Sequence, residues 1–89
     1  MSQLNFAKVG KAYKAEYRAD GGTLIVEVSC SKPENITVSS KVSADAEPDV
    51  ISSKLARSAR FDLTPINGPE TIVVMVTGDA VPTGYVTEY

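Results

Sequence analysis

The carboxylates and lysines of this chain of 89 residues could in principle act as a general base or a nucleophile, but the usual catalytic pairs cannot be built from it. Cys30 is the only cysteine, and histidine is absent. Without histidine, neither a Ser-His-Asp nor a Cys-His arrangement can be built, and one cysteine cannot supply a standard structural zinc site. The phosphate-cradling motifs Gly-x-Gly-x-x-Gly and the Walker loop do not occur either. We therefore expect no catalytic residues, no cofactor and no enzymatic activity.

Cys30 ends a stretch of alternating residues, 23–30, whose apolar side chains would share one face of a strand. A thiol on the same face as Leu24, Val26 and Val28 behaves as a small buried hydrophobe. We expect no base and no helix N-terminus nearby to activate it. Cys30 is therefore predicted to be shielded in the folded protein.

Asp45, Glu47 and Asp49 are spaced two residues apart, and an extended backbone would place their carboxylates on one side. Such oxygens could bind Ca²⁺. However, no glycine shapes this loop, and no further acidic residue follows at the spacing of an EF-hand. We expect a solvated loop and no metal site.

Basic residues form two clusters, one made of Lys8, Lys11, Lys14 and Arg18 and the other of Lys54, Arg57 and Arg60. Each cluster could meet an acidic protein surface or a phosphate backbone. Lysine is also common on edge strands, where it discourages pairing between molecules. The formal net charge is −2, so we expect solvated faces or a protein partner, and no binding to nucleic acid or to an anionic membrane.

The tyrosines lie near the two ends of the sequence, at Tyr13, Tyr17, Tyr85 and Tyr89. Tyrosine and arginine are enriched at the centres of protein interfaces, and the chain contains no tryptophan. If the terminal strands pair, these tyrosines and Arg18 could form one patch that binds another protein. The other interpretation is that Tyr13 and Tyr17 cover the core with their hydroxyls at its rim. The predicted interface residues are Tyr13, Tyr17, Arg18, Tyr85 and Tyr89.

β-Strands must position these residues, because alternation of apolar and polar side chains runs through most of the chain. Alternation is clear over residues 13–18, 23–30 and 36–42. Residues 71–77 form an apolar run rich in β-branched side chains, which is typical of a central strand. The predicted core residues are Leu24, Val26, Val28, Ile36, Val38, Phe61, Leu63, Ile72, Val74 and Val76.

Turn chemistry separates these segments, notably at residues 20–22, which contain two glycines, and at residues 32–35, which contain a proline. Recurring turns between short alternating segments are typical of a sandwich or a barrel. The pattern predicts one domain over residues 1–89. We expect an all-β antiparallel sandwich of two sheets, immunoglobulin-like or fibronectin-like, with six or seven strands.

Residues 50–63 fit two kinds of secondary structure. Their alternate apolar positions would share one strand face, and they are Ile51, Leu55, Ala59, Phe61 and Leu63. The first three also have the i, i+4 spacing of a helix. We favour a strand, because the alternation continues to the end of the segment whereas the helical spacing does not. A short helix over 52–59, followed by a strand from Arg60, is the alternative.

The N-terminal segment from Leu4 to Tyr17 reads Leu-Asn-Phe-Ala-Lys-Val-Gly-Lys-Ala-Tyr-Lys-Ala-Glu-Tyr. It resembles the start of small β-rich proteins that are encoded with the structural genes of phages and prophages. The resemblance covers roughly the first fifth of the chain and contains no catalytic motif. It implies a virion-associated role, such as capsid decoration or an accessory of the head or tail, and it assigns no functional residue.

The sequence predicts a non-enzymatic structural or protein-interaction domain, and the resemblance implies a phage virion accessory. Its partners would be proteins, including further copies of itself in a homo-oligomer or a particle. The alternative is an immunoglobulin-like module of a larger surface protein that binds a ligand or a carbohydrate. No secretory signal is visible, and no apolar run approaches the roughly 20 residues that span a bilayer. We expect cytoplasmic localisation, or a place in the virion for a phage-derived protein.

Overall fold

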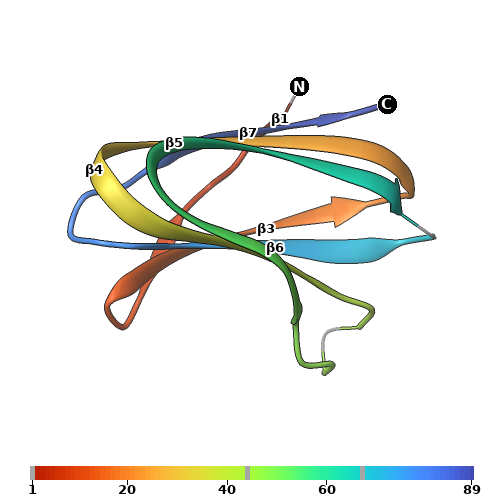
Figure 1. Ribbon diagram of the computed structural model, residues 1–89. Coiled ribbons are helices and arrows are strands. Elements are labelled where there is room, and N and C mark those ends of the chain that lie inside the picture. Colours follow the sequence, from red (N-terminus) through yellow and green to blue (C-terminus); the bar gives the residue numbers. More distant parts are fainter. Residues whose placement is uncertain (1, 44, 67) are drawn as a thin grey trace.

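Seven β-strands make up the computed structural model, which describes residues 2–43, 45–66 and 68–89, with the backbone alone at 64–66 (Figure 1). They are β1 (Ser2–Gln3), β2 (Ala7–Val9), β3 (Ala12–Ala19), β4 (Gly22–Lys41), β5 (Asp49–Ile66), β6 (Glu70–Thr77) and β7 (Thr83–Glu88). All of their pairings are antiparallel. Over the described residues, no helix is long and apolar enough to cross a membrane. The prediction of an all-β antiparallel fold is confirmed.

The strands form one sheet in the order β1-β7-β4-β6-β3-β2, and β5 pairs with β4. β4 takes part in both halves of this sheet: its residues 24–29 pair with β7, and its residues 36–41 pair with β6. β5 follows β4 through both parts. The sheet therefore curls over on itself into a half-barrel, in which the bent β4 and β5 join the two layers (Figure 1). The predicted sandwich of two sheets is not confirmed, because a single curled sheet supplies both layers.

The bend in β4 lies at residues 29–34, where its register with β5 shifts. In this stretch β4 has more residues than β5 between successive paired positions, and such extra residues bend a strand without ending it. Pro33 lies in this stretch and cannot donate a hydrogen bond to the ladder, which strands tolerate at bulges. The prediction of a turn at residues 32–35 is therefore wrong, because the proline marks an irregularity inside one long strand.

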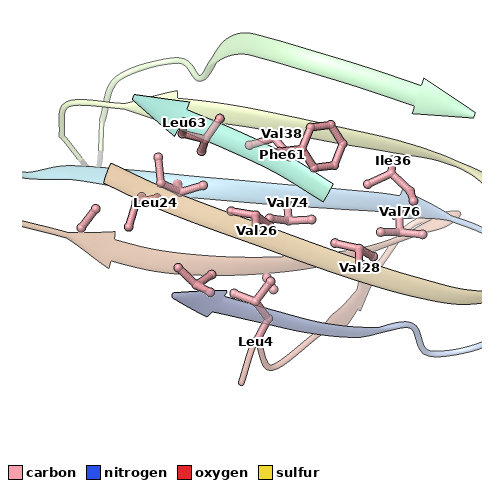
Figure 2. Close-up of a cluster of buried hydrophobic side chains, with 14 residues drawn as sticks. Leu4, Leu24, Val26, Val28, Ile36, Val38, Phe61, Leu63, Val74 and Val76 are labelled. Atoms are coloured by element: carbon pink, nitrogen blue, oxygen red, sulfur yellow. The ribbon is translucent and has the colours of Figure 1, made fainter. Parts of the chain in front are cut away.

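Side chains between the two layers form one hydrophobic core (Figure 2). The predicted core residues are all buried, namely Leu24, Val26, Val28, Ile36, Val38, Phe61, Leu63, Ile72, Val74 and Val76. Alternation explains this agreement, because every second residue of a strand faces the same side of the sheet. The core also contains Leu4, Ala15, Ala19 and Val86, which were not among the predicted residues.

Leu4 is buried although it lies in the link between β1 and β2. Its backbone N–H donates a hydrogen bond to the carbonyl oxygen of Gly84 at 2.8 Å. A Cβ atom on Gly84 would stand 2.9 Å from Leu4 Cδ1 and 3.0 Å from a ring atom of Phe6. A side chain at this position of β7 would therefore displace the side chains of Leu4 and Phe6, because the N-terminal link packs directly against the β7 backbone.

β5 shows that residues 50–63 form a strand and not a helix, as favoured from the sequence. Phe61 and Leu63 are buried, and Ala59 packs against the core. Ile51 and Leu55, predicted on the same face, are instead 47% and 71% exposed. The register explains this difference. Lys54 pairs with buried Ile36, so Leu55, which pairs with exposed Asn35, lies on the outer face, and Ile51 lies at a register shift between Val50 and Ser52.

Candidate interaction surface

Tyr13 is the most buried of the predicted interface residues, with 8% of its surface exposed. Its ring lies 5.6 Å from the ammonium nitrogen of Lys8. Its hydroxyl lies 3.4 Å from the carbonyl oxygen of Asp79, at the limit of a hydrogen bond. Tyr13 therefore covers the core, as in the second of the two interpretations, and presents little surface to a partner.

Tyr17 connects β3 to the last strand. Its hydroxyl donates a hydrogen bond to Glu88 Oε1 at 2.7 Å, and the backbone N–H of Asp20 donates to Glu88 Oε2 at 3.0 Å. The hydrogen bond from Tyr17 is the main cause that lowers the pKa of Glu88, and the same bond raises the pKa of Tyr17. These contacts close the side of the half-barrel on which the ends of β3 and β7 approach each other.

Tyr85, Tyr89 and Arg18 are exposed. Tyr85 is 38% exposed and lies between two buried residues of β7, so its side chain faces away from the core. Tyr89 is 73% exposed, and Arg18 belongs to β3 in the other layer. The structure brings Tyr17 to the end of β7, but it does not gather the five predicted residues into one patch.

A further exposed part of the fold is the outer edge of β5. β5 pairs with β4, and among the residues that the structure describes no strand lies along its other side. Three apolar side chains near its start are exposed, namely Val50 (67%), Ile51 (47%) and Leu55 (71%). An unpaired edge presents backbone N–H and C=O groups that another strand can bind. We refer to residues 49–57 as the β5 edge segment.

A groove on the outer face of the sheet lies beside this segment. It has a volume of about 400 Å³ and is lined by Ala12, Asn35, Thr37, Ser39, Pro48, Val50, Met75 and Thr77. Pro48 comes from the connection between β4 and β5, Val50 comes from β5, and Met75 comes from β6. None of these lining residues is charged or aromatic. The groove therefore fits an apolar side chain or a small apolar ligand and offers no acid or base for catalysis.

A hydrogen-bond network stabilises one end of the groove. Thr77 Oγ1 accepts a hydrogen bond from the backbone N–H of Asn35 at 3.0 Å and donates one to Glu34 Oε1 at 3.1 Å. Gly78 follows with a φ of 118°. A Cβ atom on Gly78 would stand 2.7 Å from Glu34 Cδ. The Glu34 carboxyl thus occupies the space of the missing side chain, at a backbone conformation that other residues rarely adopt.

The second basic cluster is largely engaged within β5 itself. The ammonium nitrogen of Lys54 lies 4.8 Å from the centre of the Phe61 ring and donates a hydrogen bond to the carbonyl oxygen of Arg60 at 2.9 Å. Arg60 forms an ion pair with Asp62 at 3.2 Å. Arg57 is exposed. Of this cluster, Arg57 is therefore the residue best placed to contact another molecule.

Cys30 packs against the hydrophobic core but remains partly accessible. It lines a shallow pocket together with Ser29, Arg57 and Ser58. Burial and the charge of Glu34 raise the pKa of the Cys30 thiol, so the thiol is a weak nucleophile at neutral pH. The predicted shielding is therefore only partial.

Asp45, Glu47 and Asp49 are all exposed. Within residues 2–43, 45–66 and 68–89, no group of three or more His, Cys, Asp or Glu side chains is placed to hold a metal ion. The absence of a calcium site in this loop stays a prediction, which a calcium titration would test.

The β5 edge segment and the groove were not among the predicted interface residues. One sequence signal for the edge exists: Ser53 and Arg57 interrupt the apolar face that carries Ile51 and Leu55, which is unfavourable for a core strand. The groove has no local signal, because its lining residues come from four strands and a hairpin.

Comparison of the chain with protein-family models, with curated proteins and with solved structures finds no match in any of the three. The function must therefore be inferred from the β5 edge segment and the groove themselves.

Proposed function

We propose that this protein is a non-enzymatic structural protein that binds other protein chains at the β5 edge segment. The observation that supports this proposal is the coincidence of an unpaired strand edge with the exposed side chains of Val50, Ile51 and Leu55. Soluble proteins usually protect such edges with charge, proline or a covering element. Apolar residues at an open edge are typical instead of a site that a partner covers.

The incoming segment would add to β5 as a further strand. Its backbone would pair with the free N–H and C=O groups of the edge, which provides affinity, while alternate side chains provide specificity. Side chains on the outer face would lie beside Leu55 and beside Val50, which also lines the groove. An extended apolar segment is therefore the ligand that best fits both features.

The chemistry of the surface supports binding rather than catalysis. The side chains that line the groove supply hydroxyls, one amide and apolar groups, without an ionisable group. Cys30, the one thiol of the chain, has a raised pKa. Binding an apolar segment requires neither a nucleophile nor a general base, so the residues present are sufficient for this function.

A place in a larger particle is one form that this function could take. The resemblance of residues 4–17 to phage structural proteins implies such a role, and a capsid or tail accessory needs a surface that binds protein. The alternative proposal is an immunoglobulin-like ligand-binding module, with the two layers acting as a sandwich. The groove of about 400 Å³ favours it. Without an aromatic lining residue on which a sugar could stack, this ligand would be apolar and not a carbohydrate.

Selection from a displayed library of random peptides tests the proposal. We expect the enriched peptides to carry apolar residues at alternate positions, and we expect Leu55→Glu to weaken their binding by about tenfold or more, because a carboxylate would lie among apolar contacts. Fluorescence anisotropy with labelled peptides measures this change. Val81→Glu is the matched control, since Val81 is 64% exposed but lies between β6 and β7.

Peptides that bind the Leu55→Glu variant as tightly as the wild type would contradict the proposal. If small apolar ligands bind while Met75→Glu removes that binding and Leu55→Glu does not, the ligand-binding alternative is favoured instead.

A further inference from the structure

The β5 edge segment pairs regularly with β4 over residues 52–56 only. Its register shifts between Val50 and Ser52, where Ile51 is an extra residue, and it shifts again beyond Ala56. A bulge disrupts the ladder of a strand locally, so an added strand finds its continuous free edge between these two points. Five residues are a usual length for a strand.

Ser53 is the small outer-face residue of this regular stretch. It pairs with Thr37, which lines the groove. Its neighbours along the outer face of β5 are Leu55 on one side and Val50, which also lines the groove, on the other. Both are larger, apolar and exposed, at 71% and 67%. A side chain that enters the groove from the free edge therefore meets the least obstruction above Ser53.

We infer that the segment bound at the β5 edge segment carries an aromatic side chain opposite Ser53, and that this side chain crosses Ser53 to enter the groove. This inference rests on the proposed function and names the feature by which the partner is selected. Directly opposed residues of neighbouring strands place their side chains on the same face of the sheet, so a partner residue opposite Ser53 faces outward. Ser53 is then the specificity-determining residue of the edge.

The distance to the groove and its lining both favour an aromatic side chain. Neighbouring strands are about 4.8 Å apart, so Thr37 of β4 lies two spacings, about 10 Å, from the backbone of the added strand. Only a long side chain spans most of this distance. The groove has a volume of about 400 Å³ and no charged lining residue. An aromatic ring fills such a space with a large apolar area at a low cost in conformational entropy.

The substitution Ser53→Leu fills the space above this residue and tests the inference. Two peptides are compared that differ only in Phe or Ala at the aromatic position enriched in the selected library. We expect the wild type to bind the Phe peptide about tenfold more tightly or better. Ser53→Leu should bind both peptides within about twofold of the wild type's affinity for the Ala peptide, because the Ala peptide does not use this space. Fluorescence anisotropy measures all four affinities.

Two control variants separate the lost space from other effects of substitution. Ser53→Ala removes the hydroxyl, which lies 3.1 Å from that of Thr37, but leaves the space open. Ser52→Leu adds the same side chain one residue away, at a position that pairs with buried Val38 and so lies on the opposite face. We expect both variants to keep the preference for the Phe peptide.

The methyl signals of Thr37 and Val50 in nuclear magnetic resonance spectra report on the place of the ring. An aromatic ring stacked on a methyl group shifts its proton signal upfield. We expect such shifts with the Phe peptide and not with the Ala peptide. Val81, which is 64% exposed and lies between β6 and β7, should show no shift with either peptide.

Loss of the preference in Ser53→Leu, its retention in both controls and the methyl shifts together support the inference. An equal preference in the wild type and in Ser53→Leu, with binding still weakened by Leu55→Glu, overturns the aromatic anchor and leaves the proposed function intact. Selected peptides that carry no aromatic residue but need Leu55 have the same meaning. Peptide binding that Leu55→Glu does not weaken overturns both.

Discussion

Replacement of Gly78 by alanine tests how tightly the end of the groove is built. Gly78 has a φ of 118°, which a residue with a side chain adopts at a cost of about 1–3 kcal/mol. The new Cβ would also stand 2.7 Å from Glu34 Cδ, so the carboxyl must move. Its hydrogen bond from Thr77 Oγ1, worth about 0.5–1.5 kcal/mol, is then lost. We expect Gly78→Ala to lower the free energy of unfolding by about 2–4 kcal/mol.

Urea unfolding followed by circular dichroism measures this loss. Gly10→Ala is the matched control, because Gly10 also has a positive φ, 62°, but nothing lies within 4 Å of its Cβ position; we expect a cost of about 1 kcal/mol there. In a Glu34→Ala background, Gly78→Ala should cost about 0.5–1.5 kcal/mol less than in the wild type, because no carboxyl has to move and no hydrogen bond is lost. The reasoning is refuted if Gly78→Ala costs no more than Gly10→Ala, or if removal of the Glu34 carboxyl changes nothing.

Three other measurements test contacts elsewhere in the fold. Hydrogen bonding lowers the pKa of Glu88 and raises that of Tyr17, so the stability from this pair should be lost as pH falls below about 4 and as it rises above about 10. In Tyr17→Phe, the melting temperature should therefore fall less steeply than in the wild type at both the acidic and the alkaline end of the pH range. A pH profile identical to that of the wild type would contradict this. Val74→Ala at a fully buried position should cost about 1–3 kcal/mol in urea unfolding, whereas Val42→Ala, 69% exposed, should cost less than about 0.5 kcal/mol; equal costs would contradict the packing. Cys30 should react with a thiol reagent completely but more slowly than a free cysteine at neutral pH, because burial raises its pKa, and reaction at the rate of a free thiol would count against that cause.

The core could be predicted from the sequence because alternation is a local property. Each of Leu24, Val26 and Val28 lies in a run whose neighbours already indicate the buried face. The curl of the sheet has no such local signal. The stretch around Pro33 has the composition of a turn, and it remains a strand because β5 pairs with β4 on both sides of the bend. Pairing between segments far apart in the sequence therefore decided the architecture.

The candidate site could be predicted only by residue type. Tyrosine is a common interface residue, but the environment of each tyrosine depends on distant partners. Tyr17 is engaged by Glu88 at the other end of the chain, 71 residues away, and Tyr13 lies under Lys8 in the core. Tyr85 and Tyr89 alone kept the exposure that an interface requires.

The ambiguity of residues 50–63 has a physical cause in the structure. Ile51 and Leu55 fitted a helix and a strand because Ser53 and Arg57 interrupt the apolar face that they would share with Phe61. A core strand rarely accepts such an interruption, since a buried arginine must be paired. In the first half of β5, Val50 and Leu55 pair with Ser39 and Asn35 on the outer face of the sheet, and they are exposed. Under the proposed function, a second molecule covers these exposed apolar residues. Substitutions at Leu55 should therefore change peptide binding and leave the stability of the single chain nearly unaltered, so the peptide experiment reports on binding alone.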